Sequence, residues 1–273
     1  MDNVRKSVIA GSWYPGDPSV LRRDIAGYFR RVPDRELSGE LVGLIAPHAG
    51  YIYSGQVAAF AYQLVRGKKY DAVVLIGPSH RVAFSGVSVW GGGAFETPLG
   101  RVPVHEKLAE EMKRASGIVV DFPAAHAREH SLEIQLPFLQ VALGDFSFVP
   151  LVMGDQNAAT CRDLAKAIVQ AGKNRRLLIV ASSDLSHFHE DIKARALDGV
   201  ALRHLQDSDA EGLLENLARD RTEACGGGPM AVAILAAGGL GASHSLVLKY
   251  THSGEVTGDC QSVVGYASAV YYK

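Results

Sequence analysis

The strongest constraint on the fold is a set of short apolar runs that polar residues hardly interrupt and that stop abruptly at polar residues. Three of these runs occupy residues 41–46 (LVGLIA), 72–76 (AVVLI) and 177–181 (LLIVA). They are rich in Val, Ile and Leu and do not alternate with polar residues, which is typical of strands that are covered on both faces. We therefore expect a sheet that is buried between layers of helices.

The rest of the chain continues this pattern. Further strands are predicted over residues 87–90, 146–152, 245–250 and 263–271, and helices over 104–115, 158–172, 209–220 and 229–239. Strands that alternate with helices indicate an α/β fold. The last two strands are separated by a short turn and should form an antiparallel hairpin, so the sheet is expected to be mixed. No linker or repeat divides the sequence, and residues 1–273 are predicted to form a single domain.

Charge and composition argue against several classes of partner. The chain has 28 basic and 29 acidic residues, a net charge of −1, so we expect neither nucleic acid nor an anionic membrane as a partner. No apolar run is long enough to span a bilayer, and the first residues lack the apolar core of a signal peptide. Three cysteines in a chain of this size do not indicate a disulfide framework, which favours a cytoplasmic location.

Polar residues with catalytic or ligating chemistry follow three of the buried runs. His48 comes just after the first run, His80 after the second, and Asp184 and His187 after the third. In open α/β sheets, ligands bind beyond the carboxyl ends of the strands. Each residue alone would also fit a loop or a helix cap. Their recurrence at three strand ends predicts a functional site at that edge of the sheet.

Two further segments offer reactive side chains. Cys225 precedes three glycines and a proline that predict a helix start, where the positive end of the helix dipole favours a thiolate. The alternative is a buried, inert thiol. His130 lies in the stretch AREHSLEIQLPFLQ and could reach the site. Equally, Glu129 or Glu133 of this stretch could satisfy buried backbone groups or a buried cation.

This set of residues supports two mechanisms. Two histidines and a thiolate form a plausible three-ligand site for iron, copper or zinc, with coordination positions left open for water or substrate. His187 would then act as a general acid or base, oriented by Asp184. The alternative needs no metal: Cys225 would be the nucleophile of a cysteine hydrolase, activated by His187 or His48.

Eight motifs, taken together, resemble a known family. In chain order they read AGSWYP, APHAGYIYSG, GPSH, FETPLG, EHSLEIQLPFLQ, SSDLSH, CGGGPM and SVVGYASAVY, and they span nearly the whole sequence. The set resembles the Memo family, in the bacterial and archaeal branch often labelled AmmeMemoRadiSam system protein B. The resemblance implies a single-domain three-layer sandwich with a central mixed, mostly parallel sheet, similar to class III extradiol dioxygenases, which use non-haem iron(II).

The resemblance also implies roles for individual residues. In those dioxygenases two histidines and a glutamate hold the metal, and a further histidine is the acid/base. His48 and His80 match the two histidine ligands, His187 matches the acid/base, and Cys225 stands at the position of the carboxylate ligand. Memo relatives are associated with iron or copper bound by such a set. Because a thiolate changes the ligand field and is itself oxidisable, catechol cleavage does not follow from the fold.

The sequence therefore predicts a cytoplasmic, metal-dependent redox protein that acts on a small molecule or a protein side chain. The residues expected at the site are His48, His80 and Cys225 as metal ligands, His187 and Asp184 as catalytic groups, and His130 and Tyr53 beside the substrate. The family label implies a functional link to a radical-SAM enzyme and an AMMECR-type protein. The main alternative is a non-enzymatic module that binds a peptide or another partner in the same pocket.

Overall fold

A computed structural model describes residues 3–273. Its main sheet contains all seven predicted strands and two short ones, β7 and β10, that the sequence did not indicate. The strands are β2 (Leu41–Ala46), β3 (Ala72–Pro78), β4 (Val87–Val89), β7 (Val119–Asp121), β8 (Phe148–Met153), β9 (Leu177–Ser182), β10 (His187–His189), β11 (His244–His252) and β12 (Val263–Tyr272). Their order is β10-β12-β2-β9-β3-β8-β4-β7, and β11 also pairs with β12.

The sheet is mixed, as predicted, and its parallel part is central. Strands β2, β9, β3 and β8 run parallel to one another. Strand β12 is antiparallel to its neighbours and forms the predicted hairpin with β11, while β4 runs antiparallel to β8. In the parallel part, Ala46 is in register with Ser182, and Ile76 with Ala181. The carboxyl ends of these strands therefore lie at one edge of the sheet.

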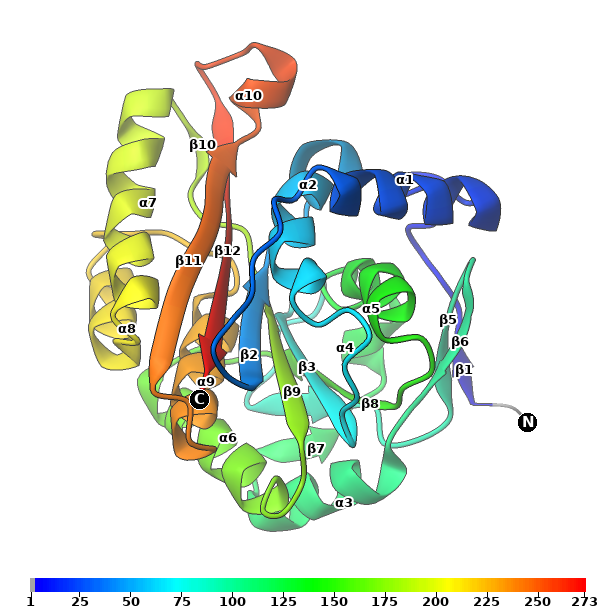
Figure 1. Ribbon diagram of the computed structural model, residues 1–273. Coiled ribbons are helices and arrows are strands. Elements are labelled where there is room, and N and C mark those ends of the chain that lie inside the picture. The colour runs from blue at the N-terminus through cyan, green and yellow to red at the C-terminus, as the bar shows by residue number, and fades with distance from the viewer. Residues whose placement is uncertain (1–2) are drawn as a thin grey trace.

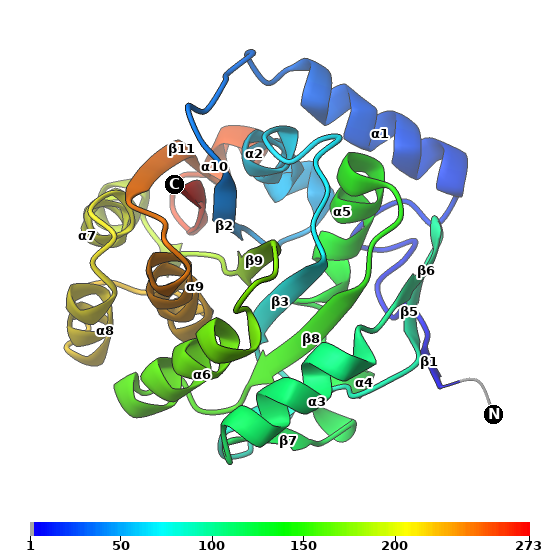
Figure 2. The ribbon, with the colours of Figure 1, turned by 60° about the horizontal axis from the view of Figure 1, so that its bottom comes forward.

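Helices cover both faces of the sheet (Figures 1 and 2). One face is packed against α1 (Pro18–Arg30), α2 (Tyr51–Gln63), α4 (Ala124–Ala127) and α5 (Leu136–Leu143), which follows the 3-10 turn η1 (Glu133–Gln135). The other face is packed against α3 (Glu106–Ala115), α6 (Ala158–Ala171), α7 (Asp191–Gln206), α8 (Ala210–Ala218) and α9 (Gly227–Gly239). The short helix α10 (Gly254–Thr257) lies between β11 and β12. This three-layer α/β architecture is consistent with the extradiol dioxygenase-like fold that the resemblance implies.

The continuous apolar runs follow from this burial on two sides. In β3, Val73 and Leu75 belong to the hydrophobic cluster on one face, and Val74 and Ile76 to the cluster on the other. Each such side chain contributes roughly 1.5–3 kcal/mol to stability when fully buried. A polar residue at any of these positions, on either face of the strand, would lose that contribution. Among residues 3–273, no helix is both long and apolar enough to cross a membrane.

A small second sheet holds the N-terminal segment. It consists of β1 (Val4–Arg5), β5 (Ala94–Thr97) and β6 (Gly100–Pro103), in the order β1-β5-β6. No strand was predicted over GGGAFETPLG (residues 91–100), but this stretch contains β5 and the first residue of β6. Strand β5 pairs with a segment some ninety residues earlier in the chain, and a local pattern does not reveal such a partner.

Candidate metal centre

Three loops at the carboxyl edge of the parallel strands meet at the predicted site. Strand β2 ends at Ala46, and His48 comes after Pro47. Strand β3 ends at Pro78, and His80 is two residues further on. One donor atom each from His48, His80 and Cys225 lie within 4.8 Å of one another. The Cys225 Sγ is 3.0 Å from the His48 Nε2. The structure therefore brings together the three side chains that the sequence predicted as ligands.

Hydrogen bonds fix the tautomer of His48. Its Nδ1 is 3.0 Å from the Ser182 Oγ, and that hydroxyl donates its own proton to the Ser131 carbonyl at 2.6 Å. The Ser182 Oγ can therefore only accept from the imidazole, so Nδ1 carries the proton and Nε2 keeps a free lone pair. Burial, and next the neighbouring His80, lowers the pKa of His48 to about 3. The ring is neutral, which is the form that binds a metal.

A carboxylate orients His80 in the same way. The Glu129 Oε1 is 2.9 Å from the His80 Nδ1, and Glu129 also accepts the backbone N–H groups of His80, His130 and Ser131 at 2.6, 2.9 and 2.9 Å. Burial alone would raise the pKa of Glu129, but the hydrogen bonds from His80 and the amides lower it to about 2. An ionised carboxylate on one ring nitrogen, with the other nitrogen free, is the usual arrangement behind a metal-bound histidine.

The Cys225 thiol lies in surroundings that oppose its ionisation. Burial, and next the charge of Asp184, raises the pKa of Cys225 above its ordinary value. This differs from the expectation that the start of α9 would favour a thiolate, because loss of water outweighs the helix dipole here. The thiol would lose its proton readily only beside a cation such as a bound metal ion. The arrangement therefore disfavours a metal-free cysteine hydrolase.

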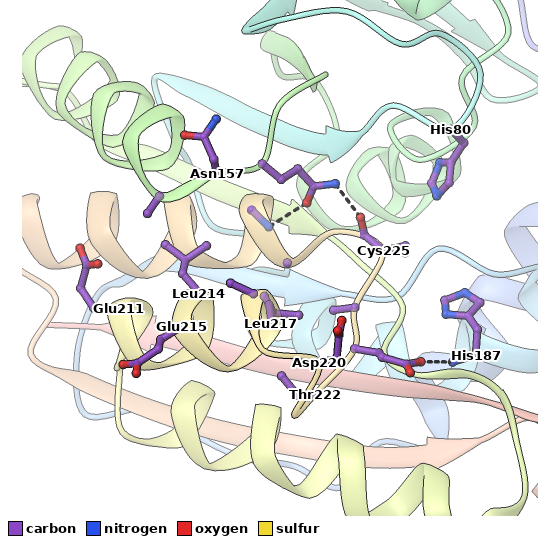
Figure 3. Close-up of a pocket in the computed structure, with 17 residues that line it drawn as sticks. His80, Asn157, His187, Glu211, Leu214, Glu215, Leu217, Asp220, Thr222 and Cys225 are labelled. Carbon is purple, nitrogen blue, oxygen red and sulfur yellow. Dashed lines mark hydrogen bonds between the residues drawn. The ribbon is translucent and has the colours of Figure 1, made fainter.

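The two predicted catalytic residues have different surroundings. His187 lines the cavity, and its ring points toward His80 (Figure 3). Asp184 is buried, and its carboxylate accepts the backbone N–H of His48 at 2.7 Å. Among the described residues it makes no hydrogen bond to the His187 ring. Asp184 therefore holds the loop of His48 in place, rather than orienting His187 as the sequence suggested. Burial raises the pKa of this carboxyl group.

The ring of His130 contacts the two candidate ligand histidines, whereas Tyr53 lies apart from them. The His130 ring stacks on His80 at 4.5 Å between centroids, lies edge-on to His48 at 5.5 Å, and contacts Trp13 at 4.4 Å. Among residues 3–273 its buried Nδ1 has no hydrogen-bond partner, although the Glu129 Oε1 lies 3.4 Å away. Burial, and next His48, lowers the pKa of His130 to about 3, so the ring is neutral. Tyr53 lies in the first turn of α2. Neither Tyr53 nor His130 lines the cavity that opens beside the candidate centre.

A cavity of about 950 Å³ opens beside His80, His187 and Cys225 (Figure 3). Much of its wall comes from α8 and from the loop before α6, which the sequence did not connect with the site. In that loop the Gln156 side chain accepts the Gly228 N–H at 2.8 Å and donates to the Cys225 carbonyl at 2.9 Å. Gln156 comes three residues after β8 ends, so the strand-end rule that selected His48 and His80 also applied to it.

The donor set fits a transition-metal ion. Bonds of about 2.0–2.3 Å from one ion to nitrogen and sulfur place the donor atoms about 3.3–3.8 Å apart. The observed limit of 4.8 Å needs only small side-chain movements to reach that spacing. Two imidazoles and one thiol suit iron, copper or zinc. His80, Glu129 and His130 form a second close group, but the Glu129 oxygens already accept several hydrogen bonds.

Comparison with known proteins agrees with the motifs. A family model described as "Memo-like protein" matches residues 5–270. The chain belongs to the Memo family. The match includes every residue of the candidate centre, so the geometry described above belongs to a Memo protein.

Relatives of similar length support the assignment. A MEMO1 family protein of Thermotoga neapolitana is 40% identical over 278 residues, covering 98% of this Memo chain and 99% of its own. One from Methanobrevibacter smithii is 38% identical over 280 residues, with coverage of 98% and 99%. The crystal structure of the uncharacterized protein JW3007 from Escherichia coli K12 superimposes with a TM-score of 0.51 at 14% identity, covering 84% of this chain and 99% of its own. That likeness shows the fold alone.

Proposed function

We propose that this Memo protein is a metal-dependent redox protein that binds iron or copper through His48, His80 and Cys225. The observation that best supports the proposal is the convergence of two imidazoles, each oriented by a hydrogen bond at Nδ1, and a thiol, with donor atoms within 4.8 Å of one another. The Cys225 Sγ already lies 3.0 Å from the His48 Nε2. The substrate of the protein, a small molecule or a protein side chain, would occupy the cavity beside the candidate centre. The reducing cytoplasm would keep Cys225 available as a ligand.

A bound iron or copper ion would supply electron-transfer chemistry at the coordination positions that the three side chains leave open. Ser182 and Glu129 keep the protons of His48 and His80 on Nδ1, so that both Nε2 atoms remain ligands. Gln156 fixes the backbone at Cys225. The rigid strand ends then maintain the spacing of the donor atoms, which a metal site requires.

His187 is the proposed general acid or base. It lines the cavity, and its ring has no hydrogen-bond partner among the described side chains, so it is free to exchange a proton with a bound substrate. His130 presents a neutral ring beside both ligand histidines, where it would contact a molecule that reaches the centre. Tyr53 remains a predicted substrate contact.

Elemental analysis of protein purified without oxygen tests the proposal. We expect about one equivalent of iron or copper in the wild type and its loss in His48→Ala and Cys225→Ser. Cys260→Ser is the matched control, because Cys260 is an exposed free cysteine and should not affect metal content. If the wild type takes up no metal under any loading condition, the proposal is wrong.

A non-enzymatic binding role is the second candidate, and one observation favours it. Phe188, next to His187, is 74% exposed and adopts a left-handed backbone with φ of 61°, which is unusual for a bulky residue. Such a side chain suits contact with a partner protein. Replacement His187→Ala separates the two roles. Loss of metal-dependent oxygen consumption with intact metal binding supports an enzyme, whereas unchanged cellular function supports a binding module.

A further inference from the structure

The cavity beside the candidate centre has two unlike ends. In Figure 3, His80, Cys225 and His187 lie at one end, and Asn157 and Glu211 lie at the other. Its volume of about 950 Å³ is at the upper limit of the range for sites that enclose drug-sized ligands, about 300–1,000 Å³. A substrate that reacts at the centre can therefore extend well beyond its reacting group.

The walls between these ends are apolar and acidic. Leu214 and Leu217 of α8 form part of the apolar surface. Neither lysine nor arginine occurs among the lining residues. Apart from the two histidines, the charged side chains among them are four carboxylates. These are Glu211, Glu215, Asp220 and Glu223. An organic anion would meet carboxylates along this wall and no lysine or arginine that itself lines the cavity.

The start of α9 does not reverse this preference. A helix N-terminus can bind anions through its free amide N–H groups. Here the Gly226 N–H donates to the Ser183 Oγ at 3.0 Å, and the Gly228 N–H donates to the Gln156 Oε1 at 2.8 Å. These amides at the cavity are therefore already satisfied within the protein.

Asp220 is the carboxylate that is available to a ligand. The other three each contact a basic side chain: Glu211 with Arg162 at 2.9 Å, Glu215 with Arg219 at 2.8 Å, and Glu223 with His189 at 2.9 Å. Among the described residues, the Asp220 side chain has no partner. In Figure 3 it lies between Leu217 and His187. Asp220 is exposed and lines the same cavity as Leu217 and His187.

We propose that this cavity binds an organic cation, a primary amine or guanidinium on an apolar stem. Asp220 would be its counter-charge, and Leu214 and Leu217 would contact the stem. The assignment of this molecule as the substrate rests on the proposed function, but its binding does not require the metal. A free amine and a lysine or arginine side chain of a protein share this chemistry.

Three probes that share one stem test the charge preference. Hexylamine, hexanol and hexanoate are titrated by NMR into the metal-free and the zinc-loaded protein. We expect hexylamine to bind most tightly and hexanoate most weakly, and added salt to weaken only the amine. A lysine-containing tripeptide with blocked ends is the fourth probe. Binding tighter than that of hexylamine indicates a protein source, and weaker binding indicates a small molecule; both support a cation site.

A matched pair of variants tests the role of Asp220. Asp220→Asn removes the charge and keeps a residue that tolerates the left-handed backbone there, whose φ is 52°. We expect the dissociation constant of hexylamine to rise about three- to five-fold, with no change for hexanol. Asp207→Asn, an exposed aspartate outside the cavity, should change neither constant.

Equal binding of the three six-carbon probes, tighter binding of hexanoate, or an unchanged Asp220→Asn variant would overturn the inference. Because the metal-free protein is titrated as well, failure here remains distinct from failure of the metal site. Amine binding without metal uptake would contradict only the proposed redox function. Metal uptake without amine binding would contradict only the substrate class.

Discussion

Glu129 links the geometry of the centre to a measurable affinity. It accepts the Nδ1–H of His80 and three backbone amides, and so it both orients the ring and raises the basicity of its Nε2. Replacement Glu129→Gln keeps the shape and removes the charge. We expect metal affinity, measured by competition with a chromophoric chelator, to fall about 10- to 100-fold.

The control for this variant is Glu36→Gln, which changes an exposed glutamate elsewhere on the molecule. It should bind metal as the wild type does. Equal affinity in Glu129→Gln and the wild type would mean that Glu129 only shapes the loop. It would also weaken the case for His80 as a ligand.

His126 should make stability depend on pH. Its ring is buried, and neither nitrogen has a hydrogen-bond partner in the described part of the chain. Burial, and next Arg5, lowers the pKa of His126 from 6.5 to about 3. Between these values the unfolded chain binds a proton that the folded protein does not, so the free energy of unfolding falls as pH falls, by about 1.4 kcal/mol per unit.

Replacement His126→Phe removes the group that binds this proton in the unfolded chain. The new ring can pack against the neighbouring rings of Trp90 and Phe95. Chemical denaturation at about pH 7 and about pH 5 should show a loss of stability that is about 2 kcal/mol smaller than in the wild type. His48 and His130 are present in both proteins, so their contributions cancel in the comparison. An identical pH dependence would mean that the His126 nitrogens are satisfied, for instance by a buried water.

Single residues at the centre were predictable where they follow a strand. His48, His80 and His187 come after apolar runs that end at one edge of the sheet. There the His48 ring contacts the His80 ring, and His187 lines the same cavity as His80. Glu129 and Ser182 were not identified as partners of the histidines. Their roles depend on which ring nitrogen they contact, and that depends on side-chain geometry between segments distant in sequence.

At the scale of elements, the start of α9 should tolerate no added atom. A Cβ at Gly226 would lie 2.4 Å from the Ser182 carbonyl oxygen, whereas a Cβ at Gly238 of the same helix would meet nothing within 4 Å. We expect Gly226→Ala to destabilise the fold and to weaken metal binding, because Cys225 must move with its neighbour. Gly238→Ala should stabilise the protein by about 0.5–1 kcal/mol, since alanine is the better helix former.

Thermal denaturation and metal titration of these two variants decide the matter. If Gly226→Ala keeps wild-type stability and affinity, then the approach of α9 to β9 is looser than the structure indicates. Gly226 is the residue just before α9 and Gly238 lies within it, so a general effect of glycine replacement is controlled.

Some elements were predictable and others were not, for a physical reason. The helices α3, α6 and α8 have one apolar and one polar face, and their pattern was read correctly. Helix α2 was not predicted, because it is buried along most of its length and so lacks a polar face. Strand β10 has only three residues and pairs with the first residues of β12. Neither its length nor its composition indicates a strand.

At the scale of the whole molecule, the N-terminal segment connects the small sheet to the candidate metal centre. Arg5 forms a buried ion pair with Glu133, whose carboxylate also accepts the Val8 N–H at 2.9 Å and the Tyr14 hydroxyl at 2.7 Å. Burial alone would raise the pKa of Glu133, but Arg5 and the hydrogen bonds lower it below its usual value. Further along, Trp13 contacts the His130 ring. The segment therefore braces one side of the centre from a distance.

Replacement Arg5→Leu should release this segment. It leaves the Glu133 charge buried without its partner, which costs about 3–5 kcal/mol of unfolding free energy. Denaturation with urea measures that loss. Hydrogen exchange of the Tyr51 amide, which donates to the Trp13 carbonyl at 2.9 Å, shows whether the loosening reaches the centre. Lys6→Leu removes the neighbouring cation, whose ion pair with Glu96 is exposed, and should leave both measurements nearly unchanged. If Arg5→Leu behaves like Lys6→Leu, the N-terminal segment does not brace the site.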